Sequence, residues 1–127
     1  MVRIGQLMTQ DLVTVPAGTT VADAARVMSE RKVGSVFVQQ HNRVVGIVTE
    51  PDIVRKVVGD RKPAWGISVE TIMSTPVISI DERRSIPEAA ELMQQHHTRH
   101  LGVLKGDAIV GVLSVRDLLQ PVSDDEF

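Results

Sequence analysis

The sequence predicts a mixed fold of strands and helices, of the α+β or α/β class, built from two similar β-α-β-β-α repeats. Three observations lead to this prediction. The two halves align without a gap when the chain is shifted by 65 positions, each half alternates β-branched runs with helical periodicity, and the long helices begin behind hydroxyl-bearing caps. Because similar halves form similar supersecondary units, the junction between them is the first place to look for function.

Identical residues at matching positions make the repeat visible in the chain of 127 residues. The aligned identities include the pairs Met8 and Met73, Met28 and Met93, Gly46 and Gly111, and Asp52 and Asp117. A folded half of about 60 residues buries only about 60% of the surface that its unfolded chain exposes, which leaves it marginally stable. We therefore expect two mutually dependent repeats, residues 1–62 and residues 63–127, the latter with a short acidic tail at Ser123–Glu126.

The first half is expected to contain a strand, a helix, a hairpin and a second helix. Thr20 and Asp23 form a capping pair, and the apolar residues that follow recur with the spacing of one buried helical face. Pro51 fits the first turn of the second helix, where its missing N–H has no partner to lose. The predicted elements are an opening turn at 4–8, a strand at 13–15, a helix from 21 to about 31, strands at 35–39 and 44–48, and a helix from Pro51 to Gly59 with Ile53, Val54, Val57 and Val58 on its apolar face.

The second half repeats this order after a connector at residues 60–66, which carries Pro63, Gly66 and several charges. Ser85 and Glu88 form a capping box at the start of its long helix. The predicted elements are an opening turn at 69–73, a strand at 77–80, a helix at 86–97, strands at 101–104 and 109–113, and a last helix at 115–119 that Pro121 closes.

The composition is that of an ordinary globular chain with an aliphatic core. Apolar residues make up 43% of the chain and charged residues 24%, whereas aromatic residues make up only 2%. The net charge is −2 and no basic run is present, so we expect no nucleic-acid partner. The absence of cysteine excludes disulfides and thiol chemistry. No apolar segment approaches the roughly 20 residues that span a bilayer, and the N-terminus does not resemble a signal peptide, so we expect a cytoplasmic protein without membrane insertion.

The pattern Gly-x-x-(Thr/Ser)-x-x-Asp occurs at residues 46–52 and again at residues 111–117. In the simpler interpretation, the Thr or Ser hydroxyl caps a helix, and the Asp three residues later favours the positive end of the helix dipole. In the functional interpretation, the carboxylate accepts hydrogen bonds from both hydroxyls of a ribose, while the cap hydroxyl and the free N–H groups of the helix bind a phosphate or another polar group. The two interpretations are compatible.

Several motifs occur together in a recognisable order. They are the duplicated Gly-x-x-(Thr/Ser)-x-x-Asp pattern, the Thr-Val-Ala-Asp-Ala-Ala helix start at residues 20–25 and the Arg99-His100-Leu101 stretch. From about Ile4 to Leu119, the chain resembles a tandem pair of CBS domains, also called a Bateman module. The resemblance implies two repeats packed through their sheets with pseudo-twofold symmetry. It also implies two clefts that take AMP, ADP, ATP or S-adenosylmethionine as regulatory ligands, with no cofactor required; whether Mg²⁺ accompanies ATP is left open.

The resemblance also implies which residues contact the ligand. Thr49 and Asp52 would serve one cleft, and Ser114 and Asp117 the other. The remaining implied contacts are Arg99 and His100 at ligand phosphates, Gly34 and Ser35 at the equivalent place in the first half, and the strand starts near Thr14 and Ser79 in the adenine pockets.

The two halves differ in charge at these positions. Arg116 in the second motif stands where the first motif has Pro51, and Arg99-His100 stands where the first half has Gly34-Ser35. Since phosphate binding requires positive charge and N–H donors, we predict that the cleft with Ser114 and Asp117 is the better nucleotide site. The other cleft is expected to be weaker or empty.

Metal binding and catalysis are not expected. His96, His97 and His100 lie close together in the sequence, but no Cys or paired carboxylate completes a four-ligand shell, so phosphate contact is the preferred role for His100. The chain contains no nucleophile elbow, phosphate loop or zinc-binding helix motif. We therefore predict that the protein is not an enzyme.

Two classes of function remain open. The first is a free-standing regulatory module that binds an adenosine ligand and changes conformation or association with occupancy. The second is a structural or oligomerisation module, or an auxiliary subunit of a separately encoded enzyme or transporter, with little ligand binding. The resemblance further implies a homodimer formed through the helices, with Val54, Val57 and Val58 available for the contact, and an additional protein partner is left open.

Overall fold

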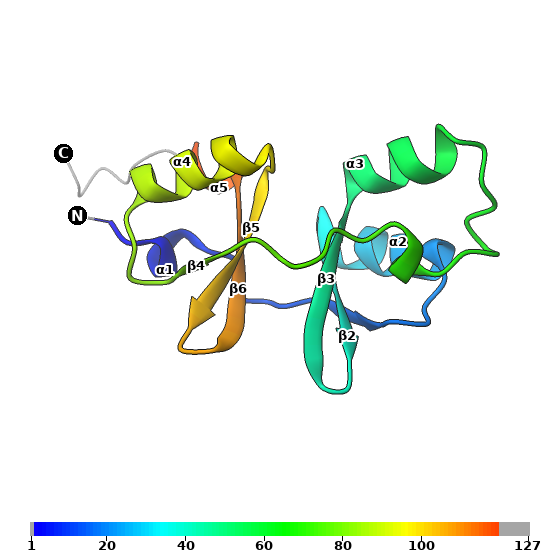
Figure 1. Ribbon diagram of the computed structural model, residues 1–127, viewed down its shortest axis with the longest axis horizontal. Coiled ribbons are helices and arrows are strands. Elements are labelled where there is room, and N and C mark those ends of the chain that lie inside the picture. Colours follow the sequence, from blue (N-terminus) through cyan, green and yellow to red (C-terminus); the bar gives the residue numbers. More distant parts are fainter. Residues whose placement is uncertain (1, 120–127) are drawn as a thin grey trace. The chain divides into compact units, whose positions relative to one another are not determined.

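The computed structural model describes residues 2–119, and Figure 1 shows the order of their helices and strands. These residues form two three-stranded sheets, each with its strands in sequence order. The two predicted β-α-β-β-α repeats are therefore confirmed. The acidic tail predicted at Ser123–Glu126 and the helix stop predicted at Pro121 lie outside the described residues.

The elements of the two repeats correspond one to one, except that a π-helical segment extends α3. The first repeat contains α1 (Ile4–Leu7), β1 (Thr14–Pro16), α2 (Val21–Arg31), β2 (Ser35–Gln40), β3 (Arg43–Thr49), α3 (Glu50–Ile53) and the π-helical segment η1 (Val54–Val58). The second contains the 3-10 turn η2 (Val69–Thr71), β4 (Ser79–Asp81), α4 (Ile86–His96), β5 (His100–Lys105), β6 (Ala108–Ser114) and α5 (Val115–Leu118).

Each sheet combines one parallel and one antiparallel strand pair. β1 pairs in parallel with β2, which pairs antiparallel with β3 so that Ser35 lies opposite Thr49. β4 pairs in parallel with β5, which pairs antiparallel with β6 so that His100 lies opposite Ser114. β1 includes Pro16, which the sequence places after the strand; a proline is tolerated there because β1 is an edge strand.

The described chain divides into two compact units, and their boundaries differ from those of the sequence repeats. One unit runs from Leu12 to Val77 and is called the 12–77 unit below. The other combines the chain up to Asp11 with the chain from Ile78 onward and is called the 78–119 unit. The division predicted at residues 62 and 63 follows the repeat in the sequence, whereas the contacts place the opening segment of each repeat with the other repeat.

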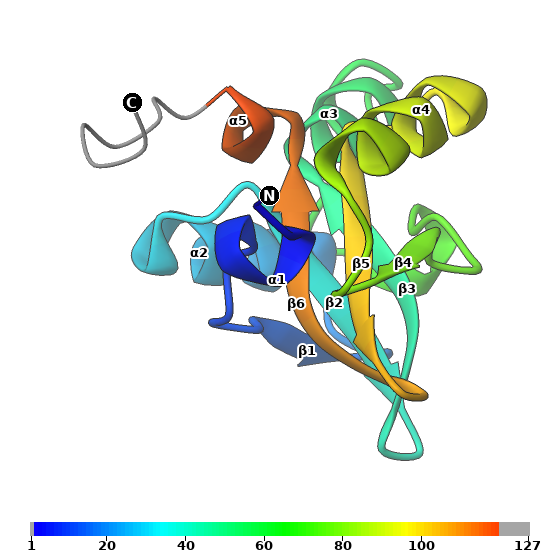
Figure 2. The ribbon, with the colours of Figure 1, turned by 90° about the vertical axis from the view of Figure 1, so that its left-hand side faces the viewer.

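Hydrogen bonds show how the opening segments are exchanged. The N–H of Ile4 donates to the carbonyl of Arg84 at 3.1 Å, and α1 lies against β6 (Figure 2). In the 12–77 unit, the N–H of Val69 donates to the carbonyl of Thr19 at 2.9 Å. Ile4 and Val69 are both fully buried. Because the aligned opening segments carry the same apolar pattern, the repeat itself does not specify which half each segment covers.

The two repeated glycines have a packing role that their motif does not reveal. A Cβ added to Gly46 would overlap the sulfur of Met73, and a Cβ added to Gly111 would lie 2.5 Å from the sulfur of Met8. The backbone beside each methionine also pairs with the sheet, since the N–H of Ser74 donates to the carbonyl of Ile47 at 2.9 Å, with the mirror contact in the other unit. Glycine is therefore needed where each opening segment crosses the last strand of a hairpin.

The two long helices begin as predicted. The Thr20 hydroxyl accepts the N–H of Asp23 at the start of α2, and a complete capping box joins Ser85 and Glu88 at the start of α4. Both helices end at a residue in the left-handed conformation, Lys32 and His97 respectively. Their apolar faces enter two separate cores, one in each unit.

The apolar face predicted for the helix after Pro51 is wrong in part. Val57 is buried in the core, but Val54 is 61% exposed and Val58 is 67% exposed. Ile53 and Val57 take the inward positions, because the helix continues beyond Ile53 as the π-helical segment η1, whose turn is wider than that of an α-helix. Two valines that were assigned to one buried face therefore remain on the surface.

Candidate ligand-binding site

The cap at Thr49 and Asp52 joins the end of β3 to the start of α3. The N–H of Thr49 donates to Oδ2 of Asp52 at 2.9 Å, and the Thr49 hydroxyl donates to the same oxygen at 3.0 Å. In return, the N–H of Asp52 donates to the Thr49 hydroxyl oxygen at 3.3 Å. These reciprocal bonds form a capping box, so the simpler interpretation of the motif is correct as far as it goes.

Ser114 and Asp117 form the same capping box between β6 and α5. The N–H of Ser114 donates to Oδ2 of Asp117 at 2.8 Å, and the Ser114 hydroxyl donates to it at 3.2 Å. No described residue donates a hydrogen bond to the other carboxylate oxygen, Oδ1. Asp117 is 8% exposed, and among the described residues no fully buried side-chain oxygen or nitrogen lacks a hydrogen-bond partner. Within the described part of the chain, Oδ1 is therefore the oxygen of Asp117 that has no donor.

The carboxylate of Asp52 has an additional partner that Asp117 lacks among the described residues. Nζ of Lys56 lies 3.1 Å from Oδ1 of Asp52 and also donates to the carbonyl of Ile72 at 2.9 Å. The residue that matches Lys56 in the second repeat is Pro121, which carries no charge. Both oxygens of the Asp52 carboxylate therefore have donors within the 12–77 unit.

A pocket of about 610 Å³ opens beside the start of α5 in the 78–119 unit. Arg99 lines it, and the N–H of Val115 donates to the Arg99 carbonyl at 3.0 Å, which fixes the Arg99 backbone at the start of α5. No described residue forms a hydrogen bond or an ion pair with the Arg99 guanidinium. The residues that line the pocket are Ala90, Met93, Gln94, His97, Thr98, Arg99, Val115 and Leu118.

The equivalent place in the 12–77 unit carries the opposite charge. Gly34 replaces Arg99, Glu50 replaces Val115, and a Cβ added to Gly34 would lie 3.1 Å from Oε1 of Glu50. A carboxylate thus lies beside the position of the first repeat that aligns with Arg99. The sequence predicted only that the first repeat lacks the positive charge of Arg99. The structure adds a negative charge, that of Glu50, at the same place.

The other predicted contact residues lie on the strands that begin near the two caps. Ser35 is buried at the start of β2 and faces Thr49 across the hairpin, and His100 is half-buried at the start of β5 and faces Ser114. Thr14 on β1 is exposed, and Ser79 on β4 is half-buried and pairs with Gly102. Each unit thus gathers its own half of the predicted residues at one end of its sheet.

Several residues of this region were not predicted from the sequence. Met93, Gln94 and Leu118 line the pocket, and none of them carries a motif that indicates ligand contact. The position of Lys56 four residues after Asp52 was a usable signal for a helical ion pair, whereas nothing in the sequence indicated its bond to Ile72. The described residues contain no group of three or more His, Asp or Glu side chains arranged to hold a metal ion.

These features define a class of protein: a tandem α/β repeat in which a Thr/Ser–Asp cap joins the last strand of each repeat to a helix. The chain belongs to the CBS domain family. The model of the CBS domain matches residues 4–59 and 69–124, which leaves the connector unmatched. None of the described helices is long and apolar enough to cross a membrane.

Solved structures with the same fold cover most of the chain. A candidate signal-transduction protein with CBS domains from Burkholderia ambifaria MC40-6 is 32% identical, with a TM-score of 0.87 over 93% of this chain and 91% of that chain. A CBS domain protein from Pyrobaculum aerophilum, solved in complex with AMP, is 30% identical, with a TM-score of 0.83 over 93% of this chain and 91% of that chain. A hexameric CBS-CP12 protein from bloom-forming cyanobacteria is 32% identical, with a TM-score of 0.88 over 94% of this chain and 70% of that chain.

Some relatives are longer proteins. This chain spans 32% of the length of an uncharacterised relative from Methanocaldococcus jannaschii, at 29% identity over 96% of this chain. It spans 62% of the length of another from Methanopyrus kandleri, at 32% identity over 94% of this chain. The same pair of repeats thus occurs within larger chains.

Proposed function

We propose that this protein is a regulatory module that binds an adenosine compound, with its better site at Ser114, Asp117 and Arg99. One observation carries the proposal. In the 78–119 unit, Asp117 has a carboxylate oxygen without a described donor, and Arg99, whose carbonyl accepts the N–H of Val115, lines a pocket and has a guanidinium without a described partner. Ser114 and Asp117 are not among the residues that line this pocket. A ligand with vicinal hydroxyls and a phosphate matches this pair of groups.

Each group has a distinct role in this proposal. Oδ1 of Asp117 accepts hydrogen bonds from the ribose hydroxyls, while Oδ2 remains bonded to Ser114 and holds the carboxylate in place. The Arg99 guanidinium binds the phosphate, and His100, the next residue and the first of β5, lies beside it in the sequence. Occupancy changes the conformation or association of the protein only if the ligand has unequal affinity for two states, and linkage then transmits that difference to a partner surface.

Relatives support the class of ligand. The Pyrobaculum aerophilum neighbour was solved with AMP, and the Burkholderia ambifaria neighbour is described in terms of signal transduction, which fits a regulatory role better than catalysis. We propose AMP, ADP, ATP or S-adenosylmethionine as the ligand, with Mg²⁺ accompanying ATP if that is the nucleotide bound. An intracellular ligand of this class agrees with the cytoplasmic location expected from the sequence.

Calorimetric titration with AMP, ATP and S-adenosylmethionine tests this function. We expect binding to the wild-type protein, a large loss of affinity in Asp117→Asn and a smaller loss in Asp52→Asn. Asparagine keeps one acceptor for the capping bond, and circular dichroism of each variant checks that it folds. A ligand that binds only the native state must also raise the melting temperature. Equal losses from the two variants would contradict the assignment of the better site, and absence of binding would contradict the function.

A second candidate function is assembly. Val54 and Val58 are large apolar residues on the surface of η1, and one solved neighbour is a hexamer. On this alternative, the chain forms a homodimer or joins a further protein through its helices, and the caps only support folding. Light scattering of the wild type and of Val58→Asp separates the two functions, because an assembly module loses its oligomer in the variant and gains no stability from any adenosine compound.

A further inference from the structure

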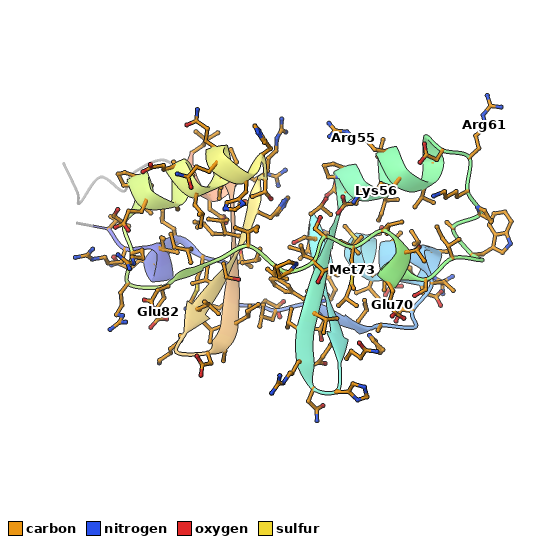
Figure 3. The ribbon with its side chains drawn as sticks, viewed as in Figure 1. Arg55, Lys56, Arg61, Glu70, Met73 and Glu82 are labelled. Atoms are coloured by element: carbon orange, nitrogen blue, oxygen red, sulfur yellow. The ribbon has the colours of Figure 1, made fainter. Side chains whose placement is uncertain are left out.

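Lys56 occupies an unusual position between the cap and an opening segment. Its ammonium group lies 3.1 Å from Oδ1 of Asp52 and 2.9 Å from the carbonyl oxygen of Ile72. The Lys56 side chain is 44% exposed and the Asp52 side chain 14% exposed, so the ion pair lies at the edge of the unit. Figure 3 labels Lys56 and the neighbouring Arg55, whose side chain extends away from the sheet.

The bond to Ile72 connects the cap to a segment from the other repeat. The residue after Ile72 is Met73, whose sulfur packs against Gly46, and the next residue, Ser74, pairs with Ile47 on β3. Ile72 itself is 2% exposed. A single ammonium group therefore joins the carboxylate of the first repeat to the opening segment of the second repeat (residues 69–74, called the strap below), which pairs with β3 through Ser74.

We propose that Lys56 competes with the ligand for the Asp52 carboxylate and couples occupancy of that site to the strap at residues 69–74. In the empty site, the ammonium group takes the carboxylate oxygen that ribose hydroxyls require. A bound ribose displaces it and releases its bond to the Ile72 carbonyl. This inference rests on the proposed function, because it assigns Asp52 to a ribose. It adds that Lys56, which is not part of the repeat motif, opposes ligand binding at Asp52.

The second repeat supplies an internal contrast. Its cap has the same Ser–Asp bonds, but the position of Lys56 is taken by Pro121, which cannot bond a carboxylate. Among the described residues, an internal cation bound to the carboxylate is therefore found only at the Asp52 site. The weaker affinity predicted for this site from its lack of positive charge acquires a second cause: an internal cation already bound to the carboxylate.

The test compares two substitutions that remove one positive charge each. Lys56→Met removes the ammonium group but keeps the apolar stem, and Arg55→Met is the control, because Arg55 is exposed and no described residue bonds its guanidinium. Both are made in an Asp117→Asn background, so that AMP titration reports mainly the Asp52 site. A partly exposed ion pair is worth up to about 1 kcal/mol, so we expect Lys56→Met to lower the dissociation constant by roughly two- to fivefold, and Arg55→Met to leave it unchanged.

An unchanged dissociation constant in Lys56→Met would overturn the proposed competition. A raised dissociation constant would overturn it as well, because Lys56 would then contact the ligand. A ligand-independent measurement follows the strap. Amide hydrogen exchange at Ile72, Met73 and Ser74 is expected to accelerate in Lys56→Met and on AMP binding to the wild type, but not in Arg55→Met. Unaltered exchange in Lys56→Met would overturn the coupling. If no adenosine compound binds the wild type, the proposed function fails and the competition with it, whereas failure of Lys56→Met alone leaves the function intact.

Discussion

The caps at Thr49–Asp52 and Ser114–Asp117 share their backbone bonds and differ in their surroundings. In both, the cap hydroxyl accepts the N–H of the Asp, and the Asp carboxylate accepts the N–H of the cap residue. Asp52 is additionally paired with Lys56, whereas no described residue pairs with Asp117 through Oδ1 or with the guanidinium of Arg99, which lines the pocket of the 78–119 unit. The repeated motif therefore supports folding in both units, while side chains outside the motif set the number of described donors that each carboxylate has.

The likeness of the two units is tested most strongly at the glycines. We expect Gly46→Ala and Gly111→Ala each to lower the free energy of unfolding by about 1–3 kcal/mol, because the added Cβ would overlap the sulfur of Met73 or Met8. Urea unfolding followed by circular dichroism measures the loss. Gly18→Ala is the control, since a Cβ there meets no atom within 4 Å. Wild-type stability in either glycine variant would show that the methionines do not hold the opening segments.

The unlikeness of the two units is tested at Arg99. We expect Arg99→Met to weaken AMP binding about tenfold or more, because a hydrogen bond to a charged group contributes about 1.5–3 kcal/mol. The control is Arg26→Met, which removes the same charge from an exposed position of α2 in the other unit. Calorimetry provides both dissociation constants, and equal values for the two variants would show that Arg99 does not contact the phosphate.

The caps themselves separate folding from binding. Thr49→Ala and Ser114→Ala are each expected to lower the free energy of unfolding by about 1 kcal/mol, since each removes an N-cap hydroxyl. Only Ser114→Ala is expected to weaken AMP binding clearly. Urea unfolding and calorimetry on the same preparations measure the two effects. An equal loss of AMP affinity in both variants would contradict the prediction that Ser114 belongs to the better site.

The smallest effect is expected from acid at the start of α4. Hydrogen bonds from Ser85, assisted by the charge of Arg84, hold the pKa of Glu88 below its usual value. The stabilisation is therefore complete above the pKa that Glu88 has in the unfolded chain, and it is lost as the pH falls through the lowered pKa of the folded state. We expect the loss of stability between pH 7 and about pH 3, measured by the urea midpoint, to be slightly smaller in Glu88→Gln than in the wild type. Glu91→Gln, outside the cap, serves as the control and should match the wild type.

Much of the fold was predictable because it depends on neighbours in the sequence. The helix starts at Thr20 and Ser85 follow from a hydroxyl three residues before an acidic side chain, and the strands follow from β-branched runs. The candidate site was predictable to the same extent: the residues of each cap are close because they share one turn. Residues that depend on packing, such as Val54 and Val58 on a π-helical turn, were not predictable from a periodicity that assumes an α-helix.

The two repeats, their order of elements and the two reciprocal caps follow from local features of the sequence, because apolar spacing and short-range hydrogen bonds involve neighbouring residues. The exchange of the opening segments, with Ile4 in the core of the second repeat and Val69 in the core of the first, follows from long-range packing. The aligned segments are alike, and each half has a glycine against which a methionine can pack. The tertiary structure also decided that Lys56 bridges Asp52 and Ile72, residues 20 positions apart. Such contacts depend on the packing of segments that are distant in the sequence. Because the two repeats have the same pattern, the pattern does not indicate which opening segment packs against which repeat.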